Sequence, residues 1–567
     1  MWAADLPPFI PFFAAALIMA LTRSHALRAA IGIAVPVLGG LHLWFDVDPG
    51  LTTYRTLFEF QLMPFRTDQL SLLFGYLFHI AAFIGMLYAL HIRDRVQQIA
   101  AMLYAGSALG AVFAGDLLTL FLFWEGLALT SVFLVWARRS KTSFATGQRY
   151  LIFQVLSGVL LLAGALLIYR DSGSLEFTKI GLDGPGSWLI LLAFGIKAGF
   201  PGLHTWLTDA YPESTPTGTV FLASFTTKVS VYALARGFPG TEMLIYVGAT
   251  MACFPIFFAV IENDLRRVLA YSMINQIGFM VCGIGIGTEL ALNGAVAHAF
   301  NDVIFKGLLF MSMGSVLHMT GKINGSDLGH LYKTMPKTTW LCIVGAASIS
   351  AFPLFSGFVS KSMVMAALLE THHEIVWLAM LFAAAGVFHH AGIKIPYFAF
   401  FAHDSGIRTQ DPPWNMVLAM TISAVLCIFI GSYPAVLYSL LPYDTGYSPY
   451  DATHVLTQTQ LLFFSAAAFV WLQLRGLYPP ELRSINLDVE WFYRKLIPST
   501  IHSVGRVIGK PAVFAWRYVV SGLLDKIGDT LSRHHGMEGT LARTWPIGSM
   551  VLWVAILLVA YLLLGYL

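Results

Sequence analysis

Apolar stretches as long as a lipid bilayer is thick recur along almost the whole of this chain. A membrane-spanning helix needs roughly 20 consecutive apolar residues. Stretches of that length run from residue 11 to residue 478 with short polar breaks, and one more occupies residues 547–567. Charged residues make up only 11% of the 567 positions and hydrophobic residues 57%, unlike a soluble domain. We therefore expect an all-α integral membrane protein with about 14 to 16 transmembrane helices.

The positive charges lie in alternate polar breaks and predict which side of the membrane each break faces. Lys and Arg gather at residues 23–28, 93–95, 138–149, 266–267 and 322–337. The positive-inside rule assigns these breaks to the cytoplasm, which places the amino terminus outside. The break at residues 209–217 is acidic, although the same count makes it cytoplasmic. The small net charge of +3 gives no reason to expect nucleic acid as a partner.

Two of the apolar stretches contain helix breakers at comparable places in the two halves of the chain. Residues 195–202 read GIKAGFPG, and residues 351–361 read AFPLFSGFVSK. Non-helical backbone at membrane depth is tolerated only where it is buried in protein or faces water. Paired broken helices therefore indicate an internal repeat whose breaks lie at an ion path. The alternative is a pair of ordinary proline kinks.

Five ionisable residues lie inside these apolar stretches. Glu125 is flanked on both sides by mostly apolar residues, and the other four are Lys197, Lys228, Lys306 and Lys361. A charge at the bilayer centre costs about 2.5 to 3.5 kcal/mol on insertion scales, and such residues are read as functional by default. Because a neighbouring charge changes the pKa of a buried amine or carboxyl, the set is suited to carrying protons. As alternatives, Lys228 snorkels to the headgroups and Lys361 lies just outside the membrane.

Three ionisable residues share one face of a predicted helix. His298 precedes Asp302 by one helical turn, and Asp302 precedes Lys306 by another. Residues four apart on a helix are neighbours on its surface, so this spacing predicts a proton wire. The alternative for His298 is a simple hydrogen bond to a neighbouring helix.

Two flanking groups are candidates for the ends of such a path. One group borders a predicted water-accessible mouth and consists of His204, Asp209 and Glu213. The other is a candidate exit at the cytoplasmic end of its helix and consists of His389, His390 and Lys394. For each group the alternative is that these are ordinary polar residues near a helix end, with no role in transport.

The sequence contains no pattern that indicates a metal, a cofactor or a nucleotide. The four cysteines are isolated in apolar stretches, without the CxxC spacing that seats zinc or an iron–sulfur cluster. Neither a dinucleotide fingerprint nor a phosphate-binding loop occurs. We predict no metal, no cofactor and no catalytic centre within this chain, so an ion gradient or a partner must drive transport.

These motifs resemble a known family. Residues 195–236 resemble the proton-channel signature of the antiporter-like proteins shared by Mrp-type cation/proton antiporters, respiratory complex I and membrane hydrogenases. The stretches LRRVLAYSMINQIGFM, AHAFNDVIFKGLLF and AFPLFSGFVSK continue the likeness in the family's order. The resemblance covers nearly the whole chain. The later stretches FHHAGIKIPYFAFF and DPPWNMVLAM look closest to the D-type subunit of proteobacterial Mrp antiporters.

The resemblance implies a domain order. N-terminal transmembrane helices are expected over residues 1–96, a first antiporter-like repeat over 97–238, and a second, inverted repeat over 239–402. Each repeat would be a five-helix bundle with one broken helix. C-terminal transmembrane helices follow over 403–478. Interleaved aromatic and basic residues near position 491 predict an amphipathic cytoplasmic-surface segment over 479–545, although a polar linker is the alternative, and a final transmembrane helix covers 546–567.

The resemblance also implies roles for individual residues. Glu125 resembles the family's glutamate that pairs with the lysine at the first break, here Lys197. Lys228 resembles the connecting lysine, Lys306 the central one, and Lys361 the lysine that controls the exit. His298 matches a family histidine, whereas Asp302 departs from members that carry histidine there, which puts its relay role in doubt.

The predicted function is that of a proton-translocating subunit of a multisubunit antiporter that exchanges Na⁺ or another monovalent cation for protons. The expected location is the bacterial inner membrane, with other membrane subunits as partners. Two alternatives stay open. One is a proton-pumping subunit of a redox complex related to complex I or a membrane hydrogenase. The other is a proton-conducting partner of an inorganic carbon uptake complex.

Overall fold

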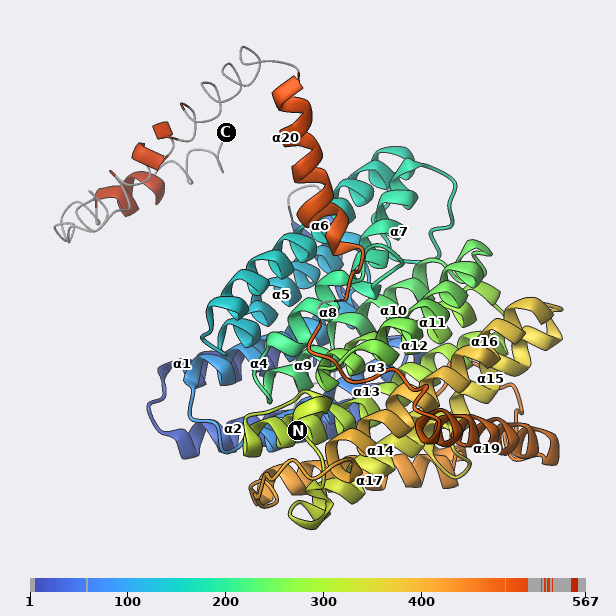
Figure 1. Ribbon diagram of the computed structural model, residues 1–567. Helices are drawn as coiled ribbons and strands as arrows, with labels where there is room; N and C mark the ends of the chain where they lie inside the picture. Colours follow the sequence, from blue (N-terminus) through green and yellow to red (C-terminus); the bar gives the residue numbers. More distant parts are fainter. Residues whose placement is uncertain are drawn as a thin grey trace. The chain divides into compact units, whose positions relative to one another are not determined.

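The computed structural model describes residues 6–57, 60–484 and 486–507, together with residues 522, 525–526, 528–530, 533 and 552–558. The chain divides into two compact units, Met1–Asn486 and Leu487–Leu567. The helices of the first unit are drawn in blue to orange in Figure 1. All of the candidate site residues belong to this first unit.

The first unit begins with helices and one hairpin. These elements are α1 (Ile10–Leu21), α2 (His25–Phe45), β1 (Thr52–Leu57), β2 (Phe60–Arg66) and α3 (Gln69–Tyr88). The two strands pair antiparallel. Their threonine and aromatic residues favour strands. The apolar pattern does not predict this hairpin, because strands of six and seven residues do not stand out beside stretches of bilayer length.

Seven helices follow and contain the first break. They are α4 (Arg95–Phe113), α5 (Leu117–Trp136), α6 (Lys141–Ser172), α7 (Pro185–Ala198), α8 (Thr205–Glu213), α9 (Gly218–Ser224) and α10 (Thr226–Gly237). Helix α7 is capped by Gly199, whose φ of 79° is left-handed, a conformation that glycine adopts without steric cost. Residues 200–204 are not helical, and α8 begins after them.

The next group of elements contains the second break. They are α11 (Met243–Ile261), α12 (Leu265–Ile286), α13 (Glu289–Thr320), η1 (Gly325–Asp327), η2 (Leu331–Lys333), α14 (Pro336–Ile349), α15 (Ser356–Glu370), α16 (Glu374–Val387), and the π-helical segments η3 (Phe388–Lys394) and η4 (Tyr397–Phe401). Helix α14 ends before the break, and α15 resumes after Pro353. Both predicted breaks are therefore interruptions of helical structure rather than kinks within a continuous helix.

The two groups repeat one another at a constant interval. Helices α11, α12 and α13 begin 148 residues after α4, α5 and α6, at positions 243, 265 and 289 against 95, 117 and 141. Both α6 and α13 have 32 residues and end at a left-handed glycine. Isolated bridges join Asp116 to Glu176 and Asp264 to Asn324, again 148 residues apart. Helix α12 is the fifth span after α5 when each broken pair is counted as one span. An odd number of crossings reverses the direction of the chain, so the two copies run in opposite directions.

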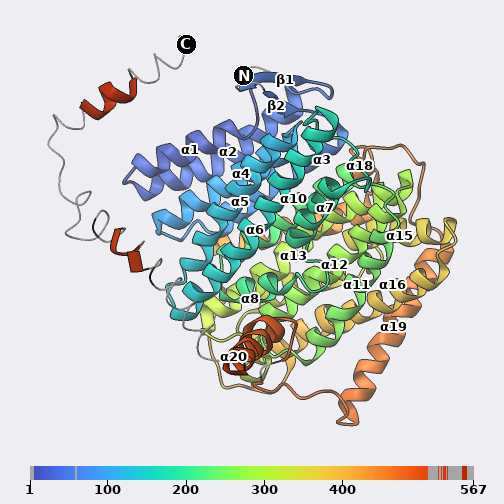
Figure 2. The same cartoon turned by 90° about the horizontal axis from the view of Figure 1, so that it is seen from above.

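The rest of the first unit consists of α17 (Trp414–Ser432), α18 (Ala435–Tyr438) and α19 (Ala452–Leu474). Helix α13 lies in the middle of the bundle, beside α12, in the view of Figure 2. Every residue of α13 from Leu290 to Val316 is buried. A helix buried on all sides presents its polar side chains only to other helices. The candidate residues His298, Asp302 and Lys306 lie on this helix.

Twelve helices among the described residues are long and apolar enough to cross a membrane, and α1 and α7 are shorter apolar helices. Helices α7 with α8, and α14 with α15, reach across only as broken pairs. The chain is a multi-pass, mostly helical membrane protein, as its apolar stretches predict, with one β-hairpin.

The second unit contains η5 (Phe492–Leu496) and α20 (Ile497–Val507). These two elements cover only part of the surface segment predicted over 479–545, because most of the residues after 507 lie outside the described part of the chain. Of the final helix predicted over 546–567, residues 552–558 are described and are helical.

Candidate functional site

The first candidate pair joins α5 to α7 at the first break. Lys197 is fully buried, and its Nζ donates a hydrogen bond of 2.5 Å to the carbonyl oxygen of Trp124. The same ammonium lies 4.5 Å from the centroid of the Trp124 ring, a cation–π geometry. The indole N–H donates to Ser157 Oγ at 2.9 Å, which holds the ring in place. The backbone and ring of Trp124 therefore position Lys197.

Glu125 follows Trp124 and interacts electrostatically with Lys197. Its carboxylate lies against Gly158 of α6, where a Cβ atom would overlap Glu125 Oε1. Among the described residues, this buried oxygen has no hydrogen-bond partner. The Glu125 carboxylate can therefore occupy this position only because residue 158 has no side chain.

The second candidate pair joins α10 to α13. Lys228 Nζ lies 2.6 Å from Asp302 Oδ2, and both side chains are completely buried. Lys228 also donates to the carbonyl oxygen of Ala223 at 3.1 Å. Helical spacing predicts Asp302 as a neighbour of His298 and Lys306 on its own helix, but its ion-pair partner comes from another helix. Sequence spacing cannot reveal a contact of that kind.

The remaining central residues surround the second break. Lys306 donates to Ser272 Oγ at 2.8 Å, and Lys361 donates to the carbonyl oxygen of Ile349, the last residue of α14, at 2.8 Å. His298 bridges two helices, since its Nδ1 lies 2.9 Å from Ser360 Oγ and its Nε2 lies 3.0 Å from Gln276 Oε1.

These residues form two electrostatically connected sets, Glu125 with Lys197 and a larger central one. Asp302 interacts with Lys228, Lys306 and Lys361, and His298 interacts with the same three lysines. We call the set formed by Glu125, Lys197, Lys228, Asp302, Lys306, His298 and Lys361 the buried row. Its lysines are almost completely buried, because the most exposed of them, Lys361, has only 4% of its surface exposed. One carboxylate thus interacts with three amines.

The predicted mouth residues have their own partners. Asp209 Oδ2 lies 2.7 Å from an Arg149 nitrogen, and Glu213 Oε2 lies 3.7 Å from Arg138. His204 is buried at the start of α8, with its ring 4.7 Å from that of Phe254. Two arginines of the basic break at 138–149 therefore neutralise the acidic break that departs from the positive-inside pattern.

The predicted exit residues lie on the π-helical segment η3, and the structure adds an unpredicted partner. Lys394 Nζ lies 2.8 Å from Oε1 of Glu481, and both side chains are buried. His390 is fully buried, whereas His389 packs against Phe469 with ring centroids 5.3 Å apart. Sequence reasoning missed Glu481 because it lies in a polar stretch that is typical of a surface segment.

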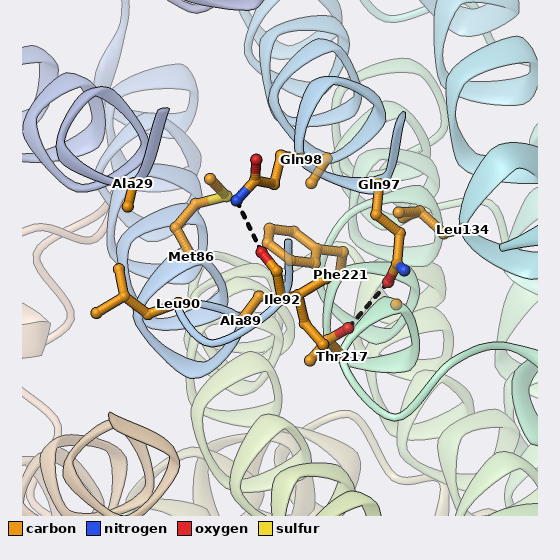
Figure 3. A pocket seen from close by; sticks show the side chains of 12 residues that line it. Ala29, Met86, Ala89, Leu90, Ile92, Gln97, Gln98, Leu134, Thr217 and Phe221 are labelled. Carbon is orange, nitrogen blue, oxygen red and sulfur yellow. Dashed lines mark hydrogen bonds between the residues drawn. The ribbon is translucent and has the colours of Figure 1, made fainter. Parts of the chain in front are cut away.

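Two cavities differ in their relation to the buried row. A cavity of about 140 Å³ between α15, α16 and α19 is lined by Lys361 and, at α19, by His454. A smaller cavity of about 20 Å³ lies among the N-terminal helices, and Figure 3 shows the hydrogen bond of 3.0 Å that Thr217 donates to Gln97 on its wall. The row's lysines do not line the smaller cavity, so of these two only the larger one adjoins the candidate site.

Among the described residues, no group of three or more His, Cys, Asp or Glu side chains is arranged to hold a metal ion. All four cysteines are free, and Cys282, Cys342 and Cys427 are buried.

Comparisons with known proteins show which proteins this chain resembles. The family model described as NADH:quinone oxidoreductase/Mrp antiporter, transmembrane, matches residues 114–388. The D-type subunit of the Na⁺/H⁺ antiporter of Alkalihalophilus pseudofirmus is 28% identical over 481 residues, which cover 78% of this chain and 97% of that protein. Hydrogenase-4 component B of Escherichia coli is 27% identical over 422 residues, which cover 66% of this chain and 63% of that protein.

Two solved structures share the fold. A chain of the membrane-bound sulfane sulfur reductase, an archaeal respiratory membrane complex, superimposes with a TM-score of 0.72 at 21% identity, covering 99% of this chain and 100% of the other. A chain of the Mrp complex from Dietzia sp. DQ12-45-1b superimposes with a TM-score of 0.68 at 20% identity, covering 81% and 98%. At these identities the likeness concerns the fold alone.

Proposed function

This chain belongs to the antiporter-like membrane subunits that NADH:quinone oxidoreductases share with Mrp antiporters, and from that premise we propose that it translocates protons as one subunit of a multisubunit cation/proton antiporter. The exchanged cation is Na⁺ or another monovalent ion, as the name of the relative from Alkalihalophilus pseudofirmus suggests. The chain resides in a bacterial inner membrane beside other membrane subunits.

The observation that carries this proposal is the buried row. Four lysines with almost no exposed surface lie on or between the two broken helices, and one carboxylate, Asp302, pairs with Lys228 and interacts electrostatically with Lys306 and Lys361. Ionisable residues inside a membrane mark ion and proton paths, because their insertion is costly. Lysine suits proton transfer since its pKa responds strongly to its surroundings, unlike that of arginine.

We infer that Asp302 switches between amines during transport. When Lys228 holds a proton, the carboxylate pairs with it. When Lys228 gives its proton up, Asp302 is free to stabilise a proton on Lys306 or Lys361. Two unit charges about 7 Å apart at an effective dielectric near 20 interact by roughly 2 kcal/mol, which changes a pKa by about one to two units. Glu125 and Lys197 would act on Lys228 in the same way from the first repeat.

In this proposal the two repeats correspond to residues 97–238 and 239–402, and each supplies half of the path. Lys361 releases the proton at the second break, next to the cavity that it lines. Asp209, Glu213 and His204 form the opposite mouth, where Arg149 and Arg138 hold the carboxylates in place.

A second candidate function is supported by the fold comparison. The archaeal respiratory complex chain matches almost the whole of both chains, so a proton-pumping subunit of a redox complex would use the same buried row. In that case the electron-transfer centres belong to other chains. We favour the antiporter because this chain spans 97% of the antiporter subunit from Alkalihalophilus pseudofirmus.

The test is ΔpH-driven cation exchange in everted membrane vesicles that contain the assembled complex. Lys228→Ala should abolish exchange because it removes the amine that faces Asp302. Lys228→Arg should abolish it too, since the guanidinium keeps the ion pair but does not release its proton. Lys322→Ala, at an exposed lysine, is the matched control and should exchange like the wild type. Exchange at the wild-type rate in both Lys228 variants would refute the proposal.

A further inference from the structure

A second cluster of buried ionisable groups lies apart from the buried row, where the ends of several helices meet. Lys394 of η3 is surrounded by three oxygens: Oε1 of Glu481 at 2.8 Å, and the carbonyl oxygens of Val260 and Glu262 at 2.7 and 2.6 Å. The side chain of Lys394 is completely buried, and that of Glu481 is 5% exposed. We call His390, Lys394 and Glu481 the port cluster.

His390 is the member of the cluster that a structural role does not explain. It lies one helical turn before Lys394 and is fully buried, and in the described part of the chain the backbone of Gly386, one turn earlier, is its one hydrogen-bonding neighbour, in a contact of poor geometry. Buried polar side chains are almost always hydrogen-bonded, so a buried imidazole with only such a contact calls for water or a functional role. His390 interacts electrostatically with Lys306 of the buried row as well as with Lys394 of its own cluster.

The local backbone supports a functional reading of this segment. A π-helical turn is rare and occurs frequently at functional sites, and η3 covers Phe388–Lys394. Gly392 packs on the second break, since a Cβ at that position would overlap Ser350 Oγ. Ser350 follows Ile349, whose carbonyl oxygen binds Lys361. The cluster therefore adjoins the break that carries the last lysine of the row.

The other end of the cluster lies near the surface, although both carboxylate oxygens of Glu481 are buried. Glu262 Oε2 accepts a hydrogen bond from Asn486 at 3.0 Å and lies 3.9 Å from Arg267. Two residues after Glu481, Arg483 pairs with Asp327 at 2.5 Å, and its side chain is 70% exposed. Burial raises the pKa of Glu481 above its ordinary value even though Lys394 opposes that shift. A carboxyl with a raised pKa accepts protons from water closer to neutral pH.

We propose that Glu481, Lys394 and His390 form a proton port between Lys306 and the aqueous phase on the face that carries Arg266 and Arg267. Glu481 takes a proton from water and passes it to the Lys394 amine. Lys394 passes a proton to His390, and His390 passes one to Lys306. Each group gains one proton and loses one, so the cluster returns to its starting charge. The inference rests on the proposed function, because it supplies protons to the same buried row.

The structural alternative is that Lys394 merely caps the end of α11 and ties the segment around residue 481 to the bundle. A lysine near a helix C-terminus does bind the last carbonyl groups. That alternative accounts for Lys394 and Glu481, and it makes a different prediction for arginine at position 394. Arginine keeps the cation and the cap, but it cannot pass a proton on.

The experiment measures ΔpH-driven exchange in everted vesicles for four variants of the full complex. Lys394→Arg and Glu481→Gln should each lower the rate by about a hundredfold, the lower end of what loss of a proton-transfer group costs. Glu481→Asp keeps a titratable carboxyl and should recover most of the rate. Asp327→Asn breaks the neighbouring exposed ion pair instead and should exchange like the wild type. Immunoblots of the membranes check that each variant is inserted to an equal level.

The outcomes separate this inference from the proposed function. Wild-type rates in both Lys394→Arg and Glu481→Gln overturn the port, and if Lys228→Ala is inactive in the same vesicles, the proposed function survives. Loss of activity in Glu481→Gln together with full activity in Lys394→Arg also overturns the port, because it identifies a structural ion pair. If one variant is not inserted, His390→Leu decides: a wild-type rate there overturns the port, and a hundredfold loss supports it.

Discussion

Gly158 determines where the Glu125 carboxylate lies, because the carboxylate occupies the space of a missing side chain. An alanine there would place its Cβ on top of Glu125 Oε1, so the carboxylate must move. Overpacking of this kind costs about 1 to 3 kcal/mol. The effect at this position falls on the one acid of the buried row that faces Lys197.

We therefore expect Gly158→Ala to lower ΔpH-driven exchange by about tenfold, the equivalent of about 1.4 kcal/mol, while the protein still inserts. Gly307→Ala is the matched control. Gly307 lies next to Lys306 on a buried helix, yet a Cβ at that position has no neighbour within 4 Å. Equal rates for the two variants would show that the position of Glu125 does not matter.

At the residue scale, the sequence predicts the row's members but not their partners. Glu125 and the four lysines are visible because charge inside an apolar stretch is costly. The pairing of Lys228 with Asp302 depends on how α10 packs against α13, and helical spacing reports only neighbours on the same helix. Glu481 could not be found because nothing in a lone glutamate after two prolines indicates burial.

At the scale of elements, the two breaks are built differently. The first uses glycines, Gly199 and Gly202, with φ of 79° and 83°. The second places Ala351 and Leu354 at φ of 57° and 74°, where a Cβ costs roughly 1 to 2 kcal/mol per residue. The glycines and prolines of the two stretches made the breaks predictable. The conformational strain at the second break could not be predicted, because it arises at an alanine and a leucine, which ordinarily favour a helix.

Thermal unfolding of the purified complex should distinguish the two breaks. Gly199→Ala introduces a Cβ into a left-handed conformation and should lower the free energy of unfolding by about 1 to 2 kcal/mol. Ala351→Gly relieves a left-handed alanine and should leave the melting temperature unchanged or raise it. A lower melting temperature in Ala351→Gly than in Gly199→Ala would contradict this account.

At the scale of the whole molecule, helix α19 is covered by little of the part of the first unit that the structure describes. Only Leu462 and Phe469 of its 23 residues are buried, while Leu456, Phe463 and Phe464 are among its exposed apolar residues. A membrane helix exposes such a surface to lipid or to another helix. The fold class followed from the apolar stretches alone, but the identity of neighbouring chains cannot be read from a surface that suits both.

Purification in a mild detergent through a tag on this chain, followed by mass spectrometry, should identify those neighbours. We expect small multi-span membrane subunits and no iron–sulfur proteins, because the proposed function is that of an antiporter. Recovery of iron–sulfur subunits in equal amounts would instead favour the redox complex. Purification with Lys228→Ala should recover the same subunits, which shows that loss of exchange is not loss of assembly.

The 148-residue interval also shows how the two oppositely oriented repeats differ at equivalent positions. Trp124 and Glu125 of α5 correspond to Ser272 and Met273 of α12, and each pair contacts lysines of the row. Gly158, against which Glu125 lies, corresponds to Lys306. A duplicated gene with identical halves would have conducted equally well from either side. Because one half has an acid and a glycine where the other has a thioether and an amine, a proton that crosses the chain meets different groups in the two halves.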